Sequence, residues 1–217
     1  MSLYVSEGKS GSMVPPLAED SYPAVCVALV DLGEQYSKNY DKWQRKIGIG
    51  WEVIGENITI DGETVPRTYY TTYTASLNSK GTLRKDLVSW RGRDFTAEEL
   101  KKFDLRNILG KPCFLQIVHK KSADGSRTYM NLAAVTKVPR GYPAPQATLP
   151  LLTFDIGVDD PAKLEQVPEW IANKVRESRT FEEYLAEVEA NKKAAPGTIL
   201  EKPEMVDLEE EDGELPF

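Results

Sequence analysis

Apolar and β-branched runs separated by polar turns predict three strands in the first third of the chain. Residues 22–33 (YPAVCVALVDLG) form a continuous apolar run that ends on glycine, which is typical of a buried strand. Residues 45–55 alternate in character, so a second strand should place four apolar side chains on one face: Ile47, Ile49, Trp51 and Val53. The polar, aromatic segment 34–43 between these strands is predicted to be a hairpin tip. A third strand, rich in Tyr and Thr, is predicted over 67–78 after an Asp-Gly turn.

The periodicity becomes helical near residue 81 and returns to strand-like near residue 113. Residues 81–93 place four apolar side chains near helical spacing: Leu83, Leu87, Val88 and Trp90. Thr96, with Glu99 three residues later, begins a second, short capped helix. Two more strands are predicted over 113–121 and 127–139, joined by a loop that contains another Asp-Gly pair.

The order of these elements is strand, strand, strand, helix, strand, strand. It predicts a mainly β protein with a five-stranded OB-type Greek-key barrel over residues 20–140 and a helical insertion between strands 3 and 4. Other small barrels and sandwiches share parts of this pattern. We therefore expect the barrel from the order of the elements and the length of the chain together.

The remaining segments are predicted to lie outside the barrel. Residues 1–19 are rich in Gly, Ser and Pro and are expected to be a flexible N-terminal arm. Residues 141–193 combine a Pro-rich segment with two amphipathic helices, which would pack on the barrel or on a second subunit. In the first helix, Trp170, Ile171 and Val175 are expected near one face. Residues 194–217 are predicted to be a linker and an acidic tail.

Charge is divided unevenly along the chain, whose net charge is −7. Residues 201–217 contain eight acidic residues and one basic residue, and so account for the whole of this excess. Residues 35–140 contain 19 basic and 11 acidic residues. A basic body with an acidic end is typical of a protein whose terminal segment is an interaction tail.

The two cysteines indicate a reducing compartment. Cys26 and Cys113 both lie inside apolar runs, where cysteine usually acts as a small hydrophobic side chain and not as part of a disulfide framework. The sequence shows no signal-peptide pattern and no apolar stretch near the roughly 20 residues that would span a bilayer. The expected location is therefore the cytoplasm, without membrane association.

The last residues of the chain (EEEDGELPF) combine acids, a proline and a terminal phenylalanine. This ending resembles that of bacterial single-stranded-DNA-binding proteins, whose disordered tails end in acids followed by Ile-Pro-Phe. The resemblance extends to five residues, with leucine in place of isoleucine: Asp212, Glu214, Leu215, Pro216 and Phe217. Gly213 replaces an acid of the family pattern. The resemblance implies that the tail docks on replication or repair proteins, the alternative being a solubilising acidic tail.

Three segments of the body resemble phage-encoded single-stranded-DNA-binding proteins in spacing and character: LAEDSYPAVCVALVDLG, ILGKPCFLQIVHKK and YMNLAAVTKVPRG. This resemblance implies the same OB fold and a role in DNA replication, recombination or repair inside a bacterial host cell.

Bases and aromatic residues are interleaved between residues 36 and 140, as non-specific binding of single strands requires. The residues expected to contact phosphates are Lys42, Arg45, Lys46, Arg67, Arg84, Lys85, Arg91, Arg93, Lys120, Lys121 and Arg127. The residues expected to stack on bases are Tyr36, Tyr40, Trp43, Tyr70, Tyr73, Trp90 and Tyr129. Trp43, in the polar stretch DKWQRK, is the first choice. Trp90 has helical spacing that fits the core equally well, and Tyr69, Tyr70 and Tyr73 cannot all face one side of a strand.

Catalytic and metal-binding patterns are not evident. The single histidine, His119, has no cysteine pair near it that would complete a zinc site, and there is no phosphate-binding loop or nucleophile-elbow motif. We therefore expect no cofactor, no metal and no enzyme activity. The predicted function is sequence-tolerant binding and protection of single-stranded DNA, in a monomer or a homo-oligomer. The alternative is an adaptor of the replication machinery whose barrel does not bind DNA, and a metal-dependent nuclease is a third reading.

Overall fold

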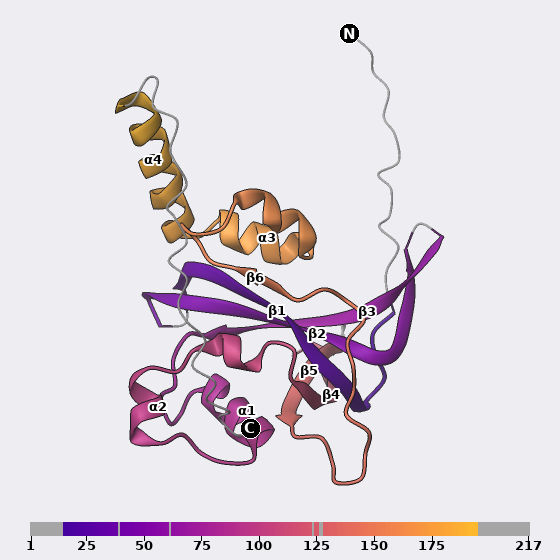
Figure 1. The fold of residues 1–217 in the computed structure, drawn as a ribbon. Helices are drawn as coiled ribbons and strands as arrows, with labels where there is room; N and C mark the ends of the chain where they lie inside the picture. The colour runs from indigo at the N-terminus through magenta and orange to yellow at the C-terminus, as the bar shows by residue number, and fades with distance from the viewer. Residues whose placement is uncertain (1–14, 39, 61, 123, 126–127, 195–217) are drawn as a thin grey trace, which may run out of the picture. The chain divides into compact units, whose positions relative to one another are not determined.

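The computed structural model describes residues 15–38, 40–60, 62–122, 124–125 and 128–194 (Figure 1). Six strands and four α-helices, with two short 3-10 helices, follow one another along these residues. The strands are β1 (Asp20–Ser37), β2 (Lys42–Ile60), β3 (Glu63–Thr74), β4 (Pro112–Lys121), β5 (Thr128–Thr136) and β6 (Leu152–Phe154). The helices are α1 (Thr82–Arg91), α2 (Ala97–Lys101), η1 (Leu105–Ile108), η2 (Pro161–Gln166), α3 (Glu169–Arg176) and α4 (Arg179–Ala194).

The protein is mainly β, and its strands form a curled, open antiparallel sheet. The strand order is β3-β2-β1-β4-β5, and the short strand β6 pairs with β1. In the β4–β5 ladder the register shifts between Gln116 and Ile117. The predicted succession of three strands, helices and two strands is confirmed, and β6 is an addition that the sequence did not indicate.

The chain divides into two compact units, and the first consists of residues 1–30, described from residue 15 onward, and residues 47–153. The four side chains predicted to share one face of β2 are all buried: Ile47, Ile49, Trp51 and Val53. Trp51 packs between two other aromatic rings, with ring centroids 6.4 Å from Tyr69 and 6.3 Å from Trp90. The helix α1 contacts both β3 and β5, the two ends of the strand order. Because Trp90 lies on α1, these ring contacts make the helix part of the core.

Helix α1 also places a carboxyl group beside a buried tyrosine. The Tyr73 hydroxyl donates a 2.8 Å hydrogen bond to Asp86, and Tyr73 is only 5% exposed. Burial raises the pKa of Asp86 above its usual value of 3.8. A group whose pKa is raised on folding favours the folded state below its unfolded pKa, and that contribution is lost as the pH rises through the folded pKa.

We therefore expect Asp86→Asn to become progressively more favourable, relative to the unchanged protein, as the pH rises from about 4 to 7. Asparagine can still accept the Tyr73 hydroxyl but carries no charge to be buried. The free energy of unfolding in urea, measured for both proteins across this range, checks the expectation. A difference between the two proteins that does not change with pH would contradict it.

A buried carboxylate holds the segment after β5 against β2. Glu52 is 3% exposed and accepts three hydrogen bonds of 2.8 Å, from the Thr148 backbone N–H, the Thr148 hydroxyl and the Leu149 backbone N–H. Charge-assisted hydrogen bonds of this kind are stronger than those between neutral groups. Glu52 therefore fixes the path of the Pro-rich segment over this part of the sheet.

The predicted N-terminal arm does not extend to residue 19. Leu17 is buried in the main core, and its carbonyl oxygen accepts a 2.7 Å hydrogen bond from the His119 ring. The carbonyl of Pro15 accepts a bond from Arg67, and Glu19 accepts one from the His119 backbone N–H. His119 therefore has a structural role in anchoring residues 15–19, and residues 1–14 lie outside the described part of the chain.

The second compact unit consists of residues 31–46 and 154–217, described as far as residue 194. It combines the last part of β1 and the first part of β2 with η2, α3 and α4. Helix α3 buries Ile171, Ala172 and Val175, but Trp170 is 46% exposed, which corrects the prediction that it shares their face. At 3.6 residues per turn, Trp170 points about 140° away from Val175.

Polar contacts join the β1 end of this unit to its helices. The Glu34 backbone N–H donates a 2.9 Å bond to the Thr180 hydroxyl, and the Gln35 amide donates a 2.6 Å bond to the Lys174 carbonyl. Gly33 has a positive φ of 62°, and a Cβ built there would lie 2.6 Å from the Ser178 hydroxyl oxygen. Glycine at this position thus permits both the backbone turn and the close approach of the helices.

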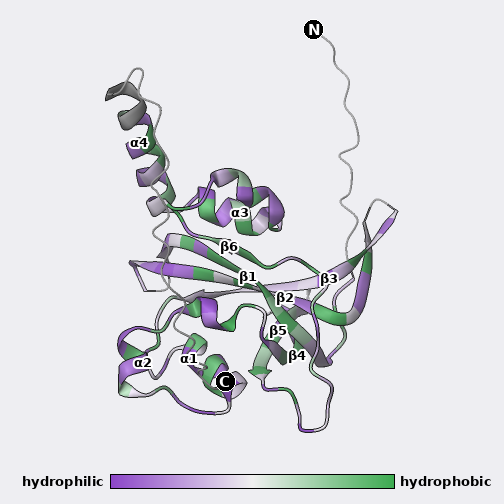
Figure 2. Ribbon diagram, viewed as in Figure 1, coloured by the Kyte–Doolittle hydropathy of each residue, from purple (hydrophilic) through white to green (hydrophobic). Residues whose placement is uncertain are grey.

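Figure 2 shows that apolar residues concentrate along β1, whereas α4 alternates between apolar and polar residues. Phe181, in the first turn of α4, is buried, while Leu185 one turn later is 42% exposed. None of the helices in the described ranges is long and apolar enough to cross a membrane.

Candidate nucleic-acid interface

Three exposed aromatic side chains gather where β1 turns into β2. We call this region, described residues 36–46, the hairpin tip. Tyr36 is 46% exposed, Tyr40 is 70% exposed and Trp43 is 45% exposed. The Tyr36 hydroxyl donates a hydrogen bond to Asp41, whose positive φ of 50° makes the turn. Large aromatic side chains are usually buried, so three of them on one short turn form a distinctive surface.

The rings of the hairpin tip lie close to one another and to cations. The Tyr36 and Trp43 ring centroids are 5.5 Å apart in an edge-to-face arrangement. The Lys42 ammonium lies 5.7 Å from the centroid of Tyr40, and the Arg179 guanidinium lies 6.0 Å from that of Trp43. Flat π-faces next to positive charges are the two components that bind single strands without regard to sequence.

Arg45 and Lys46 add two cations at the base of the hairpin tip. Arg45 forms a 2.7 Å ion pair with Asp31, a buried residue that also accepts a 3.0 Å bond from the Gly33 backbone N–H. This hydrogen bond to Asp31 raises the pKa of Arg45. Burial is the main cause that lowers the pKa of Lys46, and repulsion from Lys174 is the second. The Arg45 side chain is still 62% exposed, so its charge remains accessible from solvent.

A second group of predicted DNA-binding residues lies in the first unit, along the β4–β5 hairpin. Lys120 and Lys121 are exposed, and Lys120 pairs in register with Tyr129, which is 50% exposed. Arg127, predicted to accompany them, lies outside the described residues. The structure therefore brings two lysines and one tyrosine of the prediction together on neighbouring strands.

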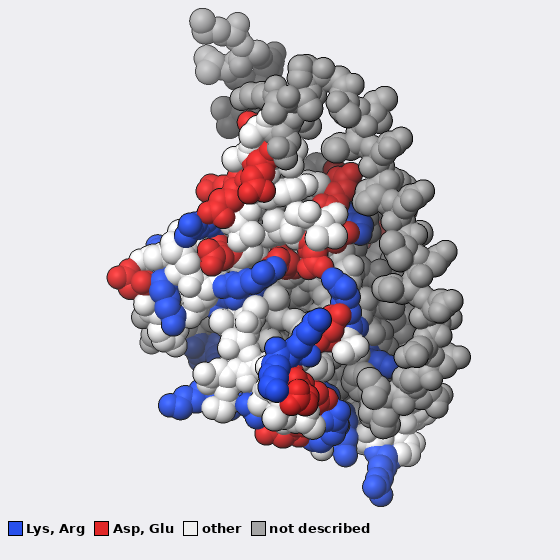
Figure 3. All heavy atoms as spheres, turned by 60° about the vertical axis from the view of Figure 1, so that its left-hand side comes forward, with Lys and Arg blue, Asp and Glu red and all other residues white. Residues whose placement is uncertain are grey.

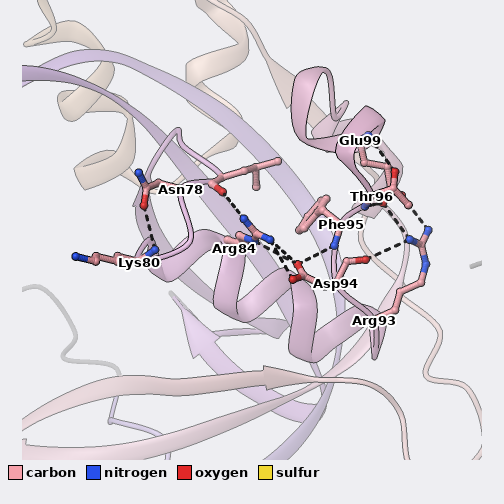
Figure 4. A network of polar contacts seen from close by, with 9 residues as sticks. Asn78, Lys80, Arg84, Arg93, Asp94, Phe95, Thr96 and Glu99 are labelled. Atoms are coloured by element: carbon pink, nitrogen blue, oxygen red, sulfur yellow. Dashed lines mark hydrogen bonds and ion pairs between the residues drawn. The ribbon is translucent and has the colours of Figure 1, made fainter.

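The predicted arginines around α1 are held by acids (Figure 4). Arg84 binds both carboxylate oxygens of Asp94 at 3.0 Å, and Arg93 binds Glu99 at 2.9 Å. Arg91, whose side chain is only 6% exposed, also binds Glu99. The hydrogen bond from Arg93 is the main reason that the pKa of Glu99 falls to about 2. These three guanidinium groups stabilise the α1–α2 region. Arg91 and Arg84 have side chains that are 6% and 18% exposed, whereas the Arg93 side chain is 49% exposed.

Lys85 is exposed on the same helix and lines a shallow cavity of about 350 Å³ together with Ser79, Arg84, Val88, Ser89 and Asp94. This lining carries two cations and one carboxylate. On the face shown in Figure 3, basic and acidic side chains are likewise intermixed. The excess of basic residues seen in the sequence is thus partly neutralised in place by neighbouring acids.

Three of the side chains that were predicted to contact DNA are buried. Tyr73 is 5% exposed, Trp90 is 7% exposed and Arg67 is 8% exposed. The Trp90 indole N–H donates to the Pro112 carbonyl at 2.8 Å, so both its ring and its polar atom are occupied in the core. Bases cannot stack on rings that are covered by protein. The predicted roles of these three residues in DNA binding are therefore withdrawn.

Tyr70 faces the opposite side of β3 from Tyr69 and Tyr73, and it is half-buried. A Cβ built on Gly50 would lie 2.4 Å from the Tyr70 ring, so this ring packs directly over the glycine backbone. Burial raises the pKa of Tyr70 to about 12. Gly50 within β2 thus marks a close approach of the Tyr70 ring to the backbone.

Two cations of the candidate interface were not predicted from the sequence. Lys174 and Arg179 come from α3 and α4, which were expected only to pack on the barrel or on another subunit. More than 130 residues separate them from Trp43 along the chain, so no local pattern relates them to the hairpin tip.

Other features of the prediction fall outside this interface. The tail residues Asp212, Glu214, Leu215, Pro216 and Phe217 lie outside the described part of the chain. Within the described residues, no group of three or more His, Cys, Asp or Glu side chains is placed to hold a metal ion. The chain matches no protein-family model, and no curated protein matches it. The functional assignment therefore depends on the chain's own residues.

Proposed function

We propose that this protein binds single-stranded DNA with little regard to sequence, through the hairpin tip. The observation that carries the proposal is the presence of Tyr36, Tyr40 and Trp43 as exposed rings on one hairpin, with the Lys42 ammonium 5.7 Å from the Tyr40 centroid. The Arg45 side chain, two residues after Trp43, is 62% exposed. Each base has a π-face that can stack on such rings, and each nucleotide carries a phosphate that cations attract. Stacking contributes about 1–3 kcal/mol per base, so two or three stacked bases suffice for a useful affinity.

We further propose that the sheet is an OB-type barrel with Greek-key connections. The strand order β3-β2-β1-β4-β5 supports this, as does the position of α1 between β3 and β4. Contacts from α1 to both β3 and β5 are those expected of a helix that packs at the end of such a barrel. In OB folds the connections between strands 1 and 2 and between strands 4 and 5 contribute to nucleic-acid binding. The hairpin tip lies at the first of these connections, and Lys120 and Lys121 are the last residues of β4, before the second.

The biological role that we propose is protection of single strands during DNA replication, recombination or repair, in a phage-infected bacterial cell. The resemblance of three body segments to phage proteins supports this. The resemblance of the terminal EEEDGELPF to bacterial tails supports a second role, in which the tail recruits replication or repair proteins. A terminal aromatic side chain with its free carboxylate can fill an apolar pocket edged by a basic residue.

The protein should bind a single-stranded oligonucleotide more tightly than the matched duplex in the same buffer. Exposed aromatic side chains need unstacked bases, which a duplex does not offer. Competition of each unlabelled DNA against a fluorescent oligo-dT measures the preference directly. Equal affinity for the two forms would count against stacking. Absence of binding to both would favour the alternative function, an adaptor that docks on replication proteins without DNA.

A further inference from the structure

We propose that α3 and α4 form part of the same single-strand site, with Lys174 and Arg179 contacting the phosphates of the strand whose bases stack on the hairpin tip. This inference rests on the proposed function and extends it, because sequence patterns assigned these helices to packing alone. It names two residues for DNA binding that lie outside the predicted domain of residues 20–140.

The first support is the firm attachment of the helices to the hairpin strands. The Glu34 backbone N–H bonds to Thr180 at 2.9 Å, and the Gln35 amide bonds to the Lys174 carbonyl at 2.6 Å. The Gln35 amide also bonds to the Leu32 carbonyl at 2.8 Å. All of these residues belong to one compact unit. Lys174 and Arg179 are therefore held in a fixed relation to the hairpin tip.

The second support is the position of Arg179 itself. Its guanidinium lies 6.0 Å from the Trp43 ring centroid, and its side chain is 52% exposed. It is balanced by two acids, Glu183 at 2.8 Å and Glu34 at 3.9 Å, which are themselves exposed. Exposed ion pairs are weak in water, so a phosphate can replace these carboxylates. A base on Trp43 would bring its own phosphate within reach of this arginine.

The third support is a pair of lysines of like charge. Lys46, at the base of the hairpin tip, and Lys174, on α3, lie close enough for repulsion from Lys174 to contribute to the lowered pKa of Lys46. A polyanion that binds across both ammonium groups would relieve this repulsion. The cation of this group that lies beside an exposed ring is Arg179, 6.0 Å from the Trp43 centroid, and Gln35 ties the Lys174 backbone to β1.

The salt dependence of oligo-dT binding tests this inference, because each phosphate contact in a single strand contributes about 0.7 to the slope of log K against log salt. We expect Lys174→Gln and Arg179→Gln each to reduce the slope by about 0.7, and the double variant to reduce it by about 1.4. Arg179→Lys keeps the positive charge and should keep the slope. Circular dichroism and the thermal midpoint establish that each variant is folded.

The matched control is Arg176→Gln, which makes the same change of charge on α3. Arg176 forms an exposed ion pair like that of Arg179, at 3.0 Å with Glu169, but its contacts with Glu169 and Asn173 lie within its own helix and not at the hairpin tip. The slope of log K against log salt for Arg176→Gln should equal that of the unchanged protein. Unaltered slopes for the Lys174 and Arg179 variants would overturn the inference while leaving the proposed function intact, and an equal loss for Arg176→Gln would overturn it as a general charge effect. If the unchanged protein fails to bind oligo-dT, the proposed function itself falls.

Discussion

Trp43→Ala is expected to weaken binding of oligo-dT by roughly 5- to 150-fold, the equivalent of one lost stack of about 1–3 kcal/mol. Trp43 is the most central ring of the hairpin tip, since it contacts both Tyr36 and Arg179. Because it is 45% exposed, its removal should leave the thermal midpoint nearly unchanged. Fluorescence anisotropy with labelled oligo-dT gives the dissociation constants.

Tyr142→Ala is the matched control for this experiment. Tyr142 is similarly exposed, at 47%, but it lies in the first compact unit, where its ring packs against Phe114, and not at the hairpin tip or on α3. Its replacement should leave the dissociation constant unchanged. If Trp43→Ala binds as tightly as the unchanged protein, Trp43 is not a stacking platform, and a collapse of its thermal midpoint would show that the side chain is structural.

Glu52→Ala is expected to lower the free energy of unfolding by roughly 3 kcal/mol, because hydrogen bonds to charged groups each contribute about 1.5–3 kcal/mol and their buried donors would lose their acceptor. The substitution removes the acceptor of all three hydrogen bonds that hold Thr148 and Leu149 against β2. Urea denaturation monitored by tryptophan fluorescence measures the loss.

Glu52→Gln provides the comparison, since an amide keeps one oxygen acceptor and nearly the same volume. It should be destabilising, but less so than Glu52→Ala. Limited proteolysis of both variants should cut first in the segment around Thr148, where the anchor is lost. An unfolding free energy within about 0.5 kcal/mol of the unchanged protein, the range of ordinary surface substitutions, would show that Glu52 does not anchor this segment.

The parts of the fold that could be predicted from the sequence depend on short-range patterns. The alternation from Ile47 to Val53 matches a strand with one buried face, and all four apolar positions are buried. The capping box at Thr96 and Glu99 is present, with each side chain bonded to the backbone of the other. Such signals depend on neighbours within a few residues, which the sequence displays directly.

The parts that could not be predicted depend on contacts between distant segments. Strand β6 has only three residues and exists because it pairs with β1, so no periodicity of its own announces it. Similarly, Trp90 is an aromatic residue of the kind that stacks on bases. In the structure it is buried with its neighbours on α1, and its indole N–H donates to the Pro112 carbonyl. The placement of Arg179 beside Trp43 is likewise a product of tertiary structure.

The candidate site shows the same division. The count of basic residues predicted a basic body, but it could not show that Asp94 and Glu99 neutralise three arginines around α1. The hairpin tip was predictable because its aromatic residues interrupt a polar stretch that lies outside any core pattern. The helical cations Lys174 and Arg179 required the structure.

Ultraviolet crosslinking of the full-length protein to oligo-dT, followed by peptide mapping, tests the central claim most directly. Zero-length crosslinks form only where a base touches a side chain, so they locate stacking without any substitution. The account predicts crosslinked peptides that contain Tyr36, Tyr40 or Trp43, the three exposed rings of the hairpin tip. Absence of crosslinks, or crosslinks confined to peptides from other parts of the chain, would contradict it.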